Sequence, residues 1–315
     1  MVLYWTMRND PANLSRREFL AASAALGVGA LPIGALAAEP LPARPIPHAG
    51  ESLPVVGIGT AIVFDIGGDA AKRAERTAVI RTMIDGGARL IDTAPSYGTA
   101  EDVVGDLLAA MNVRDRIFLA TKVRVAGRDE TLAEMNRSLE RLKTPKVDLM
   151  QIHNVRDPNA GLDVLRAWRD QGRTRYIGIT NSNPASYAAL AEVVKREKPD
   201  FLQVSYSLAE RQAEERLLPT ARDAGTAVLT ALPFGRGKLF SAVRGKALPG
   251  WAAEIGATSW AQVFLKYLLA NEAVNCVIPG TDKAEYMTDN MNAARSRLPD
   301  ASMRKQILAY WEALG

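Results

Sequence analysis

Four polar residues, Asp92, Tyr97, Lys122 and His153, follow apolar runs of the sequence in a combination that could carry proton transfer. A phenol can donate its proton to a substrate oxygen when an ammonium group lies beside it, because the ammonium favours the phenolate left behind. Asp92 is the natural counter-charge for a buried Lys122. The imidazole of His153 can hydrogen-bond the same oxygen and fix its orientation. Such a set requires a partner that supplies a hydride.

Any one of these residues alone is more often a cap or a satisfied buried group than a catalyst. For His153 the structural alternative is a core histidine whose ring bonds a backbone carbonyl. The four together, at the ends of three successive apolar runs, favour an active site. Further polar residues close the later runs, namely Asn154, Thr180, Asn181, Gln203 and Tyr206.

Eight short apolar runs, bounded by polar or glycine-containing turns, predict the strands that position these residues. They cover Val55–Thr60, Leu90–Ala94, Ile117–Val123, Leu149–Asn154, Tyr176–Asn181, Phe201–Tyr206, Ala227–Leu232 and Cys276–Pro279. Segments with helical apolar spacing lie between them, such as Leu132, Met135, Leu139 and Leu142. About eight strand and helix units predict a single-domain α/β fold over residues 55–315, the closed parallel (β/α)8 or TIM barrel, with its chemistry at the carboxyl ends of the strands.

A doubly wound open sheet is the competing architecture, and it usually carries a glycine-rich phosphate loop after its first strand. The first run here gives Gly57-Ile58-Gly59-Thr60, with no third glycine at the required offset. The barrel is therefore the preferred prediction.

Composition excludes several classes of protein and site. The 315 residues are 48% hydrophobic and 23% charged, which is ordinary globular composition, and the net charge of +4 is spread without a dense basic run. We therefore expect no nucleic-acid partner. A single cysteine, Cys276, and two histidines, His48 and His153, exclude an intramolecular disulfide, a cysteine cage and a three-histidine zinc site.

The N-terminal residues 1–37 are typical of an export signal. Arg16-Arg17 precedes a small-residue apolar segment from Leu20 to Leu36, and Ala35-Leu36-Ala37 provides small residues for a signal peptidase. The segment resembles a twin-arginine signal, which exports folded proteins, and it is too short and too rich in Ala and Gly for a stable membrane anchor. We expect a periplasmic or secreted protein that uses the twin-arginine export machinery, with a Pro-rich arm and a barrel-base hairpin over residues 38–54.

Five segments in order carry a family resemblance. They are Leu90 to Glu101 (LIDTAPSYGTAE), Ala120-Thr121-Lys122, Asp148 to Asn154 (DLMQIHN), Ile177 to Asn181 (IGITN) and Ile278-Pro279-Gly280-Thr281. Together they resemble the aldo-keto reductase family over nearly all of the chain after the signal. The resemblance implies a (β/α)8 barrel that binds a nicotinamide dinucleotide without a Rossmann fold.

The resemblance assigns a role to each matching position. It implies that Tyr97 is the general acid, that Lys122 and Asp92 tune it, and that His153 orients the carbonyl. It places Thr180, Asn181 and Gln203 on the nicotinamide carboxamide, which agrees with their hydrogen-bonding groups. The remaining cofactor-binding positions implied are Gly59, Thr60, Pro233, Gly235, Arg236, Gly237, Lys238, Thr281, Lys283 and Asn290.

Two departures from the family pattern concern the cofactor. Ala231 occupies the position of a tyrosine that stacks on nicotinamide in many relatives, unless another ring such as Phe234 substitutes. After the eighth strand only Lys283 could pair with a 2′-phosphate, and the neighbouring Asp282 would repel one. NADPH is the expected cofactor, with NADH as the alternative.

We expect an NAD(P)H-dependent oxidoreductase that reduces an aldehyde or ketone, with Tyr97 as proton donor. The alternative is a cofactor-binding, non-catalytic or sensing subunit, favoured by export and by Ala231. A metal-dependent barrel hydrolase or isomerase lacks a ligand cluster in the sequence. Apolar residues of the expected substrate loops, Ile62, Val63, Phe64 and Val155, indicate an apolar small-molecule carbonyl substrate.

Overall fold

The computed structural model describes residues 40–124, 127–154 and 161–314. Eight parallel strands are neighbours in sequence order, so the sheet runs from β3 to β10 with no change in strand order. They are β3 (Ile58–Gly59), β4 (Leu90–Asp92), β5 (Phe118–Val123), β6 (Val147–Ile152), β7 (Thr174–Asn181), β8 (Phe201–Ser205), β9 (Ala227–Ala231) and β10 (Cys276–Val277). Parallel bridges from Val56 to Val277 and from Gly59 to Gly280 join the last strand to the first. The predicted (β/α)8 barrel is therefore confirmed.

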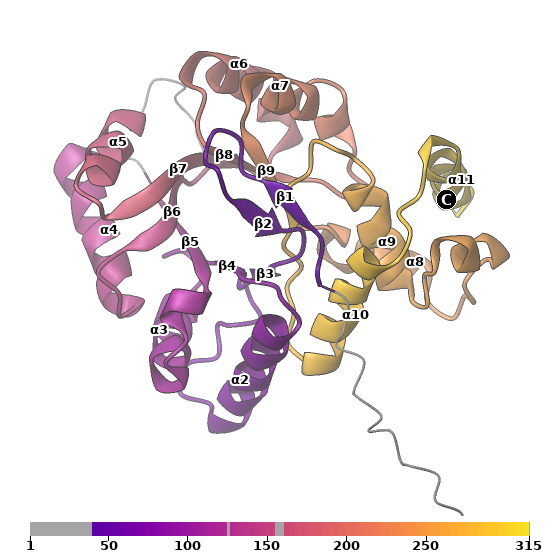
Figure 1. The fold of residues 1–315 in the computed structure, drawn as a ribbon, viewed down its shortest axis with the longest axis horizontal. Coiled ribbons are helices and arrows are strands. Elements are labelled where there is room, and N and C mark those ends of the chain that lie inside the picture. The colour runs from indigo at the N-terminus through magenta and orange to yellow at the C-terminus, as the bar shows by residue number, and fades with distance from the viewer. Residues whose placement is uncertain (1–39, 125–126, 155–160, 315) are drawn as a thin grey trace, which may run out of the picture. The chain divides into compact units, whose positions relative to one another are not determined.

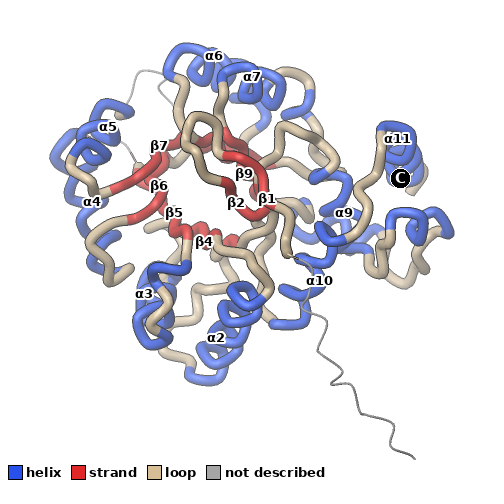
Figure 2. Tube along the Cα trace, viewed as in Figure 1, coloured by secondary structure: helices blue, strands red, loops and turns tan. Residues whose placement is uncertain are grey.

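Helices surround the strands, as Figures 1 and 2 show, and every connection between successive strands holds at least one α-helix. They are α2 (Ala70–Asp85), α3 (Ala100–Met111), α4 (Arg128–Arg141), α5 (Leu162–Asp170), α6 (Tyr187–Glu197), α7 (Leu217–Ala224), α9 (Trp260–Leu269) and α10 (Ala284–Arg295). The long connection after β9 also holds α8 (Lys238–Ala242), and α11 (Ala301–Glu312) follows the last barrel helix. Short 3-10 helices include η5 (Gly235–Gly237) and η6 (Gly250–Ile255) in that same connection.

Each predicted strand coincides with an observed one, and the boundaries differ by at most three residues. The helical spacing from Leu132 to Leu142 falls on α4, with Leu142 as its C-cap. The predicted signal, residues 1–37, lies outside the described residues. Among the residues that are described, none of the helices is both long and apolar enough to span a membrane.

Alternation along the strands decides which side chains enter the barrel. Leu90, Phe118 and Leu149 belong to the inner layer, whereas the residues that follow them, Ile91, Leu119 and Met150, pack on the helices. Because alternate residues share a face, Asp92 follows Leu90, and Lys122 follows Phe118 and Ala120, into the barrel interior. By the same alternation, Gln151 points into the barrel interior, because it lies two residues after Leu149 on β6.

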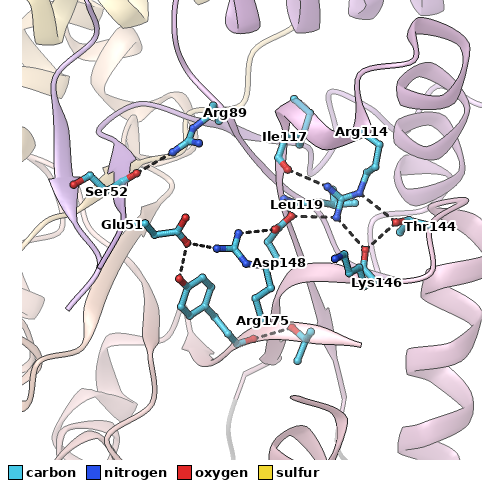
Figure 3. Close-up of polar contacts among 12 residues, drawn as sticks. Glu51, Ser52, Arg89, Arg114, Ile117, Leu119, Thr144, Lys146, Asp148 and Arg175 are labelled. Atoms are coloured by element: carbon cyan, nitrogen blue, oxygen red, sulfur yellow. Dashed lines mark hydrogen bonds and ion pairs between the residues drawn. The ribbon is translucent and has the colours of Figure 1, made fainter. Parts of the chain in front are cut away.

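An antiparallel hairpin of β1 (Ala43–Pro45) and β2 (Ser52–Pro54) lies across the end of the barrel where the strands begin (Figure 1). Ile46 and Leu53 of the hairpin pack on the inner layer with Leu90 and Phe118. Glu51 accepts a hydrogen bond of 2.6 Å from Arg175, which Figure 3 shows. It accepts another from the Tyr176 hydroxyl. The hairpin thus closes this end of the barrel with apolar contacts and an ion pair.

Asp148 is the centre of a polar network at the same end (Figure 3). Its carboxylate accepts hydrogen bonds from the Leu119 backbone at 2.8 Å, from Arg114 at 3.1 Å and from Arg175 at 3.0 Å. Arg114 also donates to the carbonyl oxygens of Ile117 and Lys146, at 3.0 and 2.9 Å. The network therefore satisfies polar groups between β5, β6 and β7.

Candidate active site

A cavity of about 670 Å³ opens at the carboxyl ends of the strands, within the range of roughly 300–1,000 Å³ that is typical of small-molecule sites. The four predicted catalytic residues, Asp92, Tyr97, Lys122 and His153, all line it. Eight of the predicted cofactor-binding residues line it as well: Gly59, Thr60, Thr180, Asn181, Gln203, Pro233, Arg236 and Gly237. The structure thus brings both sets together in one site.

Lys122 and Asp92 form a buried ion pair at the ends of β5 and β4. Lys122 Nζ lies 2.6 Å from Asp92 Oδ2 and donates a second hydrogen bond of 2.9 Å to the Thr93 carbonyl oxygen. Burial disfavours the ammonium, but the negative charge of the Asp92 carboxylate, together with the neighbouring Tyr97 oxygen, outweighs burial, so the pKa of Lys122 is raised. Lys122 therefore carries a full positive charge at neutral pH.

Gln151 completes the surroundings of the Asp92 carboxylate. Its Nε2 donates to Asp92 Oδ1 at 3.2 Å, so each carboxylate oxygen has a donor. Gln151 lies on β6 in register with Lys122 and is fully buried. The two hydrogen bonds, one to each oxygen, fix the orientation of the Asp92 carboxylate beside the Lys122 ammonium.

Tyr97 lies in the turn between β4 and α3. Its backbone N–H donates to Ala94 at 3.0 Å, and its carbonyl oxygen accepts from Ala100 at the start of α3, at 3.1 Å. Lys122 Nζ is 4.9 Å from the centre of the Tyr97 ring. The phenol is half-buried and faces the cavity beside a charged ammonium, which is the arrangement a proton donor needs.

His153 follows β6 and faces the Tyr97 ring edge-on. The two ring centres are 6.0 Å apart, and the Nδ1 atom of His153 lies 3.5 Å from Ser96 Oγ. Burial, reinforced by the positive charges of Lys122 and Arg124, lowers the pKa of His153 to about 4. The imidazole is therefore neutral at physiological pH and can donate one ring N–H to a ligand oxygen.

The opposite wall of strand ends supplies amide and hydroxyl groups. Thr180 and Gln203 are register partners on β7 and β8, and Asn181 is the last residue of β7. Within the part of the chain that the structure describes, the buried hydroxyls of Thr60 and Ser205 have no hydrogen-bond partner, and both residues line the cavity. A nicotinamide carboxamide offers one acceptor and two donors, so this donor and acceptor set fits it.

The loop after β9 carries two cations, of which Arg236 lines the cavity and Lys238 lies two residues beyond it at the start of α8. Arg236 and Lys238 are exposed, and neither forms an ion pair with any described residue. Gly237 has a φ of +86°, which only glycine adopts without strain, and its backbone borders the cavity. Free guanidinium and ammonium groups beside accessible backbone fit a phosphate-bearing ligand.

Comparison with known proteins agrees with this geometry. The sequence pattern of the Aldo/keto reductase family matches residues 55–307, which span the whole barrel. This chain belongs to the aldo/keto reductase family. Aldo-keto reductase YhdN of Bacillus subtilis (strain 168) is 34% identical over 167 residues, which cover 47% of this chain and 49% of that protein. This match therefore spans about half the length of YhdN.

Two longer matches cover most of the partner protein. Methylglyoxal reductase YeaE of Escherichia coli (strain K12) is 30% identical over 269 residues, covering 82% of this chain and 92% of that protein. The crystal structure of an aldo/keto reductase from Klebsiella pneumoniae in complex with NADP and acetate superposes with a TM-score of 0.70 and 26% identity. It covers 82% of this chain and 92% of the Klebsiella chain. Membership of the family, together with these relatives, makes the present chain an oxidoreductase.

Five predicted cofactor residues of this aldo/keto reductase do not line the cavity: Gly235, Lys238, Thr281, Lys283 and Asn290. Gly235 is buried within η5, and Lys238 begins α8. Asn290 donates to Thr281 Oγ1 at 3.1 Å, so α10 is tied to the loop after β10. Lys283 is exposed, with its Nζ 5.5 Å from the Tyr286 ring centre. Their cofactor roles stay predictions.

The substrate loops differ in part from the expectation. Ile62 and Val63 line the cavity, but Phe64 is fully buried in the core, so its assignment to the substrate wall was wrong. The Phe64 N–H donates to the Thr60 carbonyl at 3.0 Å, and the Phe64 side chain belongs to the apolar core between the strands and the helices. Val155 lies outside the described residues. Sequence reasoning missed Ser96, Phe240 and Gln151, and only strand parity with Leu149 could have indicated Gln151.

Proposed function

We propose that this aldo/keto reductase reduces an aldehyde or ketone to the alcohol with NADPH. The buried Lys122–Asp92 ion pair beneath Tyr97 carries the proposal, because it places a permanent positive charge beside a phenol at the cavity wall. The Escherichia coli relative is named a methylglyoxal reductase, and the Klebsiella relative was crystallised with NADP. The first name supports carbonyl reduction, and the second supports NADP(H) as the cofactor.

A nicotinamide dinucleotide bound in the cavity would supply the hydride. Thr180, Asn181 and Gln203 would hold its carboxamide, and Arg236 would face its phosphates. Tyr97 donates its hydroxyl proton to the carbonyl oxygen, and the Lys122 ammonium stabilises the resulting phenolate. His153, kept neutral by its low pKa, donates a hydrogen bond to the same oxygen and orients it.

Cofactor preference depends on the loop after β10. The carbonyl oxygen of Asp282 accepts a hydrogen bond from the buried Arg76 at 2.5 Å, which fixes this loop against α2. Lys283, the next residue, presents an exposed ammonium for a 2′-phosphate. We expect NADPH to bind more tightly than NADH, and Lys283→Met to reduce the preference by about tenfold or more, since one charge-assisted contact contributes roughly 1.5–3 kcal/mol.

Fluorescence titration of the purified protein with NADPH and NADH, followed by NADPH oxidation with a panel of aldehydes and ketones, tests the proposal. Saturable binding and turnover with at least one carbonyl compound are expected. Binding without repeated turnover would favour a cofactor-retaining sensing subunit, for which Ala231 at the stacking position is the supporting observation. Failure of both binding and turnover in a folded sample would contradict the reductase.

We also propose that residues 1–37 direct export through the twin-arginine pathway to the periplasm or beyond. Arg16-Arg17, the small-residue apolar segment and Ala35-Leu36-Ala37 support this proposal. A reporter protein fused after residue 37 should leave the cytoplasm, and replacing both arginines with lysine should retain it. Equal export of the two fusions would contradict the pathway.

A further inference from the structure

We infer that Ile62 is a specificity-determining residue, which selects carbonyl substrates with an extended apolar body. The inference rests on the proposed carbonyl reduction and assigns the substrate class of that site. Ile62 follows β3 and lines the cavity, yet 81% of it is exposed. A large apolar side chain exposed at a cavity is the arrangement expected of a surface that a ligand covers.

The backbone of Ile62 is held in an unfavourable conformation. Its φ is +68°, and the Val63 N–H donates across it to the Ala61 carbonyl at 2.8 Å, which forms a three-residue turn. A β-branched residue at positive φ is a genuine outlier, because its branched side chain crowds the backbone. Glycine or asparagine would adopt this conformation at lower cost, so the isoleucine side chain here is not explained by the turn.

Contacts on both sides of Ile62 impose this conformation. Arg76, a buried residue of α2, donates from Nε to the Val63 carbonyl oxygen at 2.7 Å. Asp65 accepts hydrogen bonds of 2.9 Å from the backbone N–H and the hydroxyl of Thr99, just beyond the Tyr97 turn. Surroundings that maintain a strained residue at a site wall are typical of functional positions.

A second exposed apolar side chain borders the same cavity. Phe240 of α8 is 41% exposed, and its ring packs against Phe234 with the ring centres 4.8 Å apart. Among the described residues only Ile62, Phe240 and Tyr286 are large apolar residues that are exposed, and the first two line the cavity. An alkyl or aryl group attached to the carbonyl carbon would cover such side chains, whereas a very small carbonyl compound would not reach them.

The test measures kcat/KM with NADPH for straight-chain aldehydes from propanal to octanal. In the wild type, kcat/KM should rise with chain length, by up to about fourfold for each methylene that becomes buried. Ile62→Gly and Ile62→Asn should flatten this rise and lower the octanal value about tenfold, while the propanal value changes less than about twofold. Ile62→Met, which keeps a large apolar side chain, should retain the rise of kcat/KM with chain length.

Thermal unfolding provides a readout that needs no turnover. Ile62→Gly should raise the Tm by about 2 °C, because the relief of strain exceeds the entropy cost of glycine. The matched control is Lys198→Gly, at an exposed helix end with a φ of +45° and outside the cavity lining. It should raise the Tm by less and leave the chain-length dependence of kcat/KM unchanged.

Each outcome separates the inference from the proposed function. An unchanged chain-length dependence in Ile62→Gly and Ile62→Asn, with the wild type active, would overturn the role of Ile62 alone. A lower Tm for Ile62→Gly would overturn the argument from strain. A wild type that oxidises NADPH with none of the aldehydes would overturn the proposed function instead.

Discussion

At the end of the barrel where the strands begin, the Asp148 carboxylate accepts three hydrogen bonds, whereas at the carboxyl end the buried hydroxyls of Thr60 and Ser205 have no partner among the described residues. The end where the strands begin also carries the β1–β2 hairpin, which an ion pair between Glu51 and Arg175 holds in place. Polar groups at that end stabilise the fold, because their hydrogen bonds are satisfied within the protein. Polar groups at the carboxyl end are left available to a ligand.

Backbone strain also distinguishes the cavity from the rest of the described chain. Four residues other than glycine that have positive φ line the cavity: Ile62, Asn154, Leu232 and Arg236. Elsewhere in the described chain such residues lie at helix ends, as Asn112 and Lys198 do, or in the hairpin, as His48 does. Helix ends commonly adopt this conformation to satisfy their last carbonyls. The strain around the cavity instead fixes the shape of a binding site.

Breaking the Lys122–Asp92 ion pair should cause the largest loss of stability and activity. Lys122→Met leaves the buried Asp92 carboxylate without its cation, which should lower the free energy of unfolding by about 3–5 kcal/mol and abolish turnover. Urea denaturation and NADPH oxidation measure the two effects. The control is the double variant Asp92→Leu with Lys122→Met, which should regain most of the stability but none of the activity. Activity in the double variant would show that the pair is structural only.

A pair of matched tyrosine variants sharpens the comparison. Tyr97→Phe removes the proton donor and should lower kcat by about 100-fold or more, with NADPH binding retained. Tyr176→Phe at the opposite end removes a hydroxyl that donates to Glu51, and kcat should stay within about twofold because that end takes no part in the chemistry. Steady-state kinetics distinguish the two. Equal losses in kcat would mean that the two ends do not divide stability from catalysis.

Asp148→Ala should affect stability alone. Its removal leaves the Leu119 N–H without its acceptor and takes one of several acceptors from Arg114 and from Arg175, so the free energy of unfolding should fall by about 1–3 kcal/mol. Denaturation measures this loss, and kcat at a temperature well below unfolding should be unchanged. A fall in kcat without a loss of stability would contradict the assignment of this end to the fold.

The pH dependence of stability tests the burial of His153 at the cavity wall. His153 has a pKa of about 4 in the folded protein and 6.5 as its ordinary value, so the unfolded chain binds more protons between these limits. The contribution of His153 to stability is therefore complete above pH 6.5 and is lost as the pH falls toward 4. Denaturation across this range should show the loss, and His153→Asn should reduce the slope. An unchanged slope would show that His153 is not buried as the structure has it.

The barrel and the catalytic cluster follow from local features of the sequence. Strand parity alone brings Lys122 and Asp92 into the barrel interior, because Phe118, Ala120 and Leu90 mark the inner face. Gln151 was not assigned because an amide inside an apolar run gives no indication of its partner. The inward turn of Phe64 and the positive φ of Ile62 oppose local propensity. The loop that carries both residues is fixed by tertiary hydrogen bonds, from Arg76 of α2 to the Val63 carbonyl and from Thr99 to Asp65, which no local pattern encodes.

The most direct test of the central claim follows the hydride itself. The protein is supplied with NADPH deuterated at the transferable C4 position and with a carbonyl compound that it turns over, and the alcohol is examined by mass spectrometry. Hydride transfer within the cavity predicts one deuterium per alcohol molecule, bound to the former carbonyl carbon, and none in the Tyr97→Phe sample beyond its residual turnover. Alcohol without deuterium, or NADPH oxidation without alcohol, would contradict carbonyl reduction at this site.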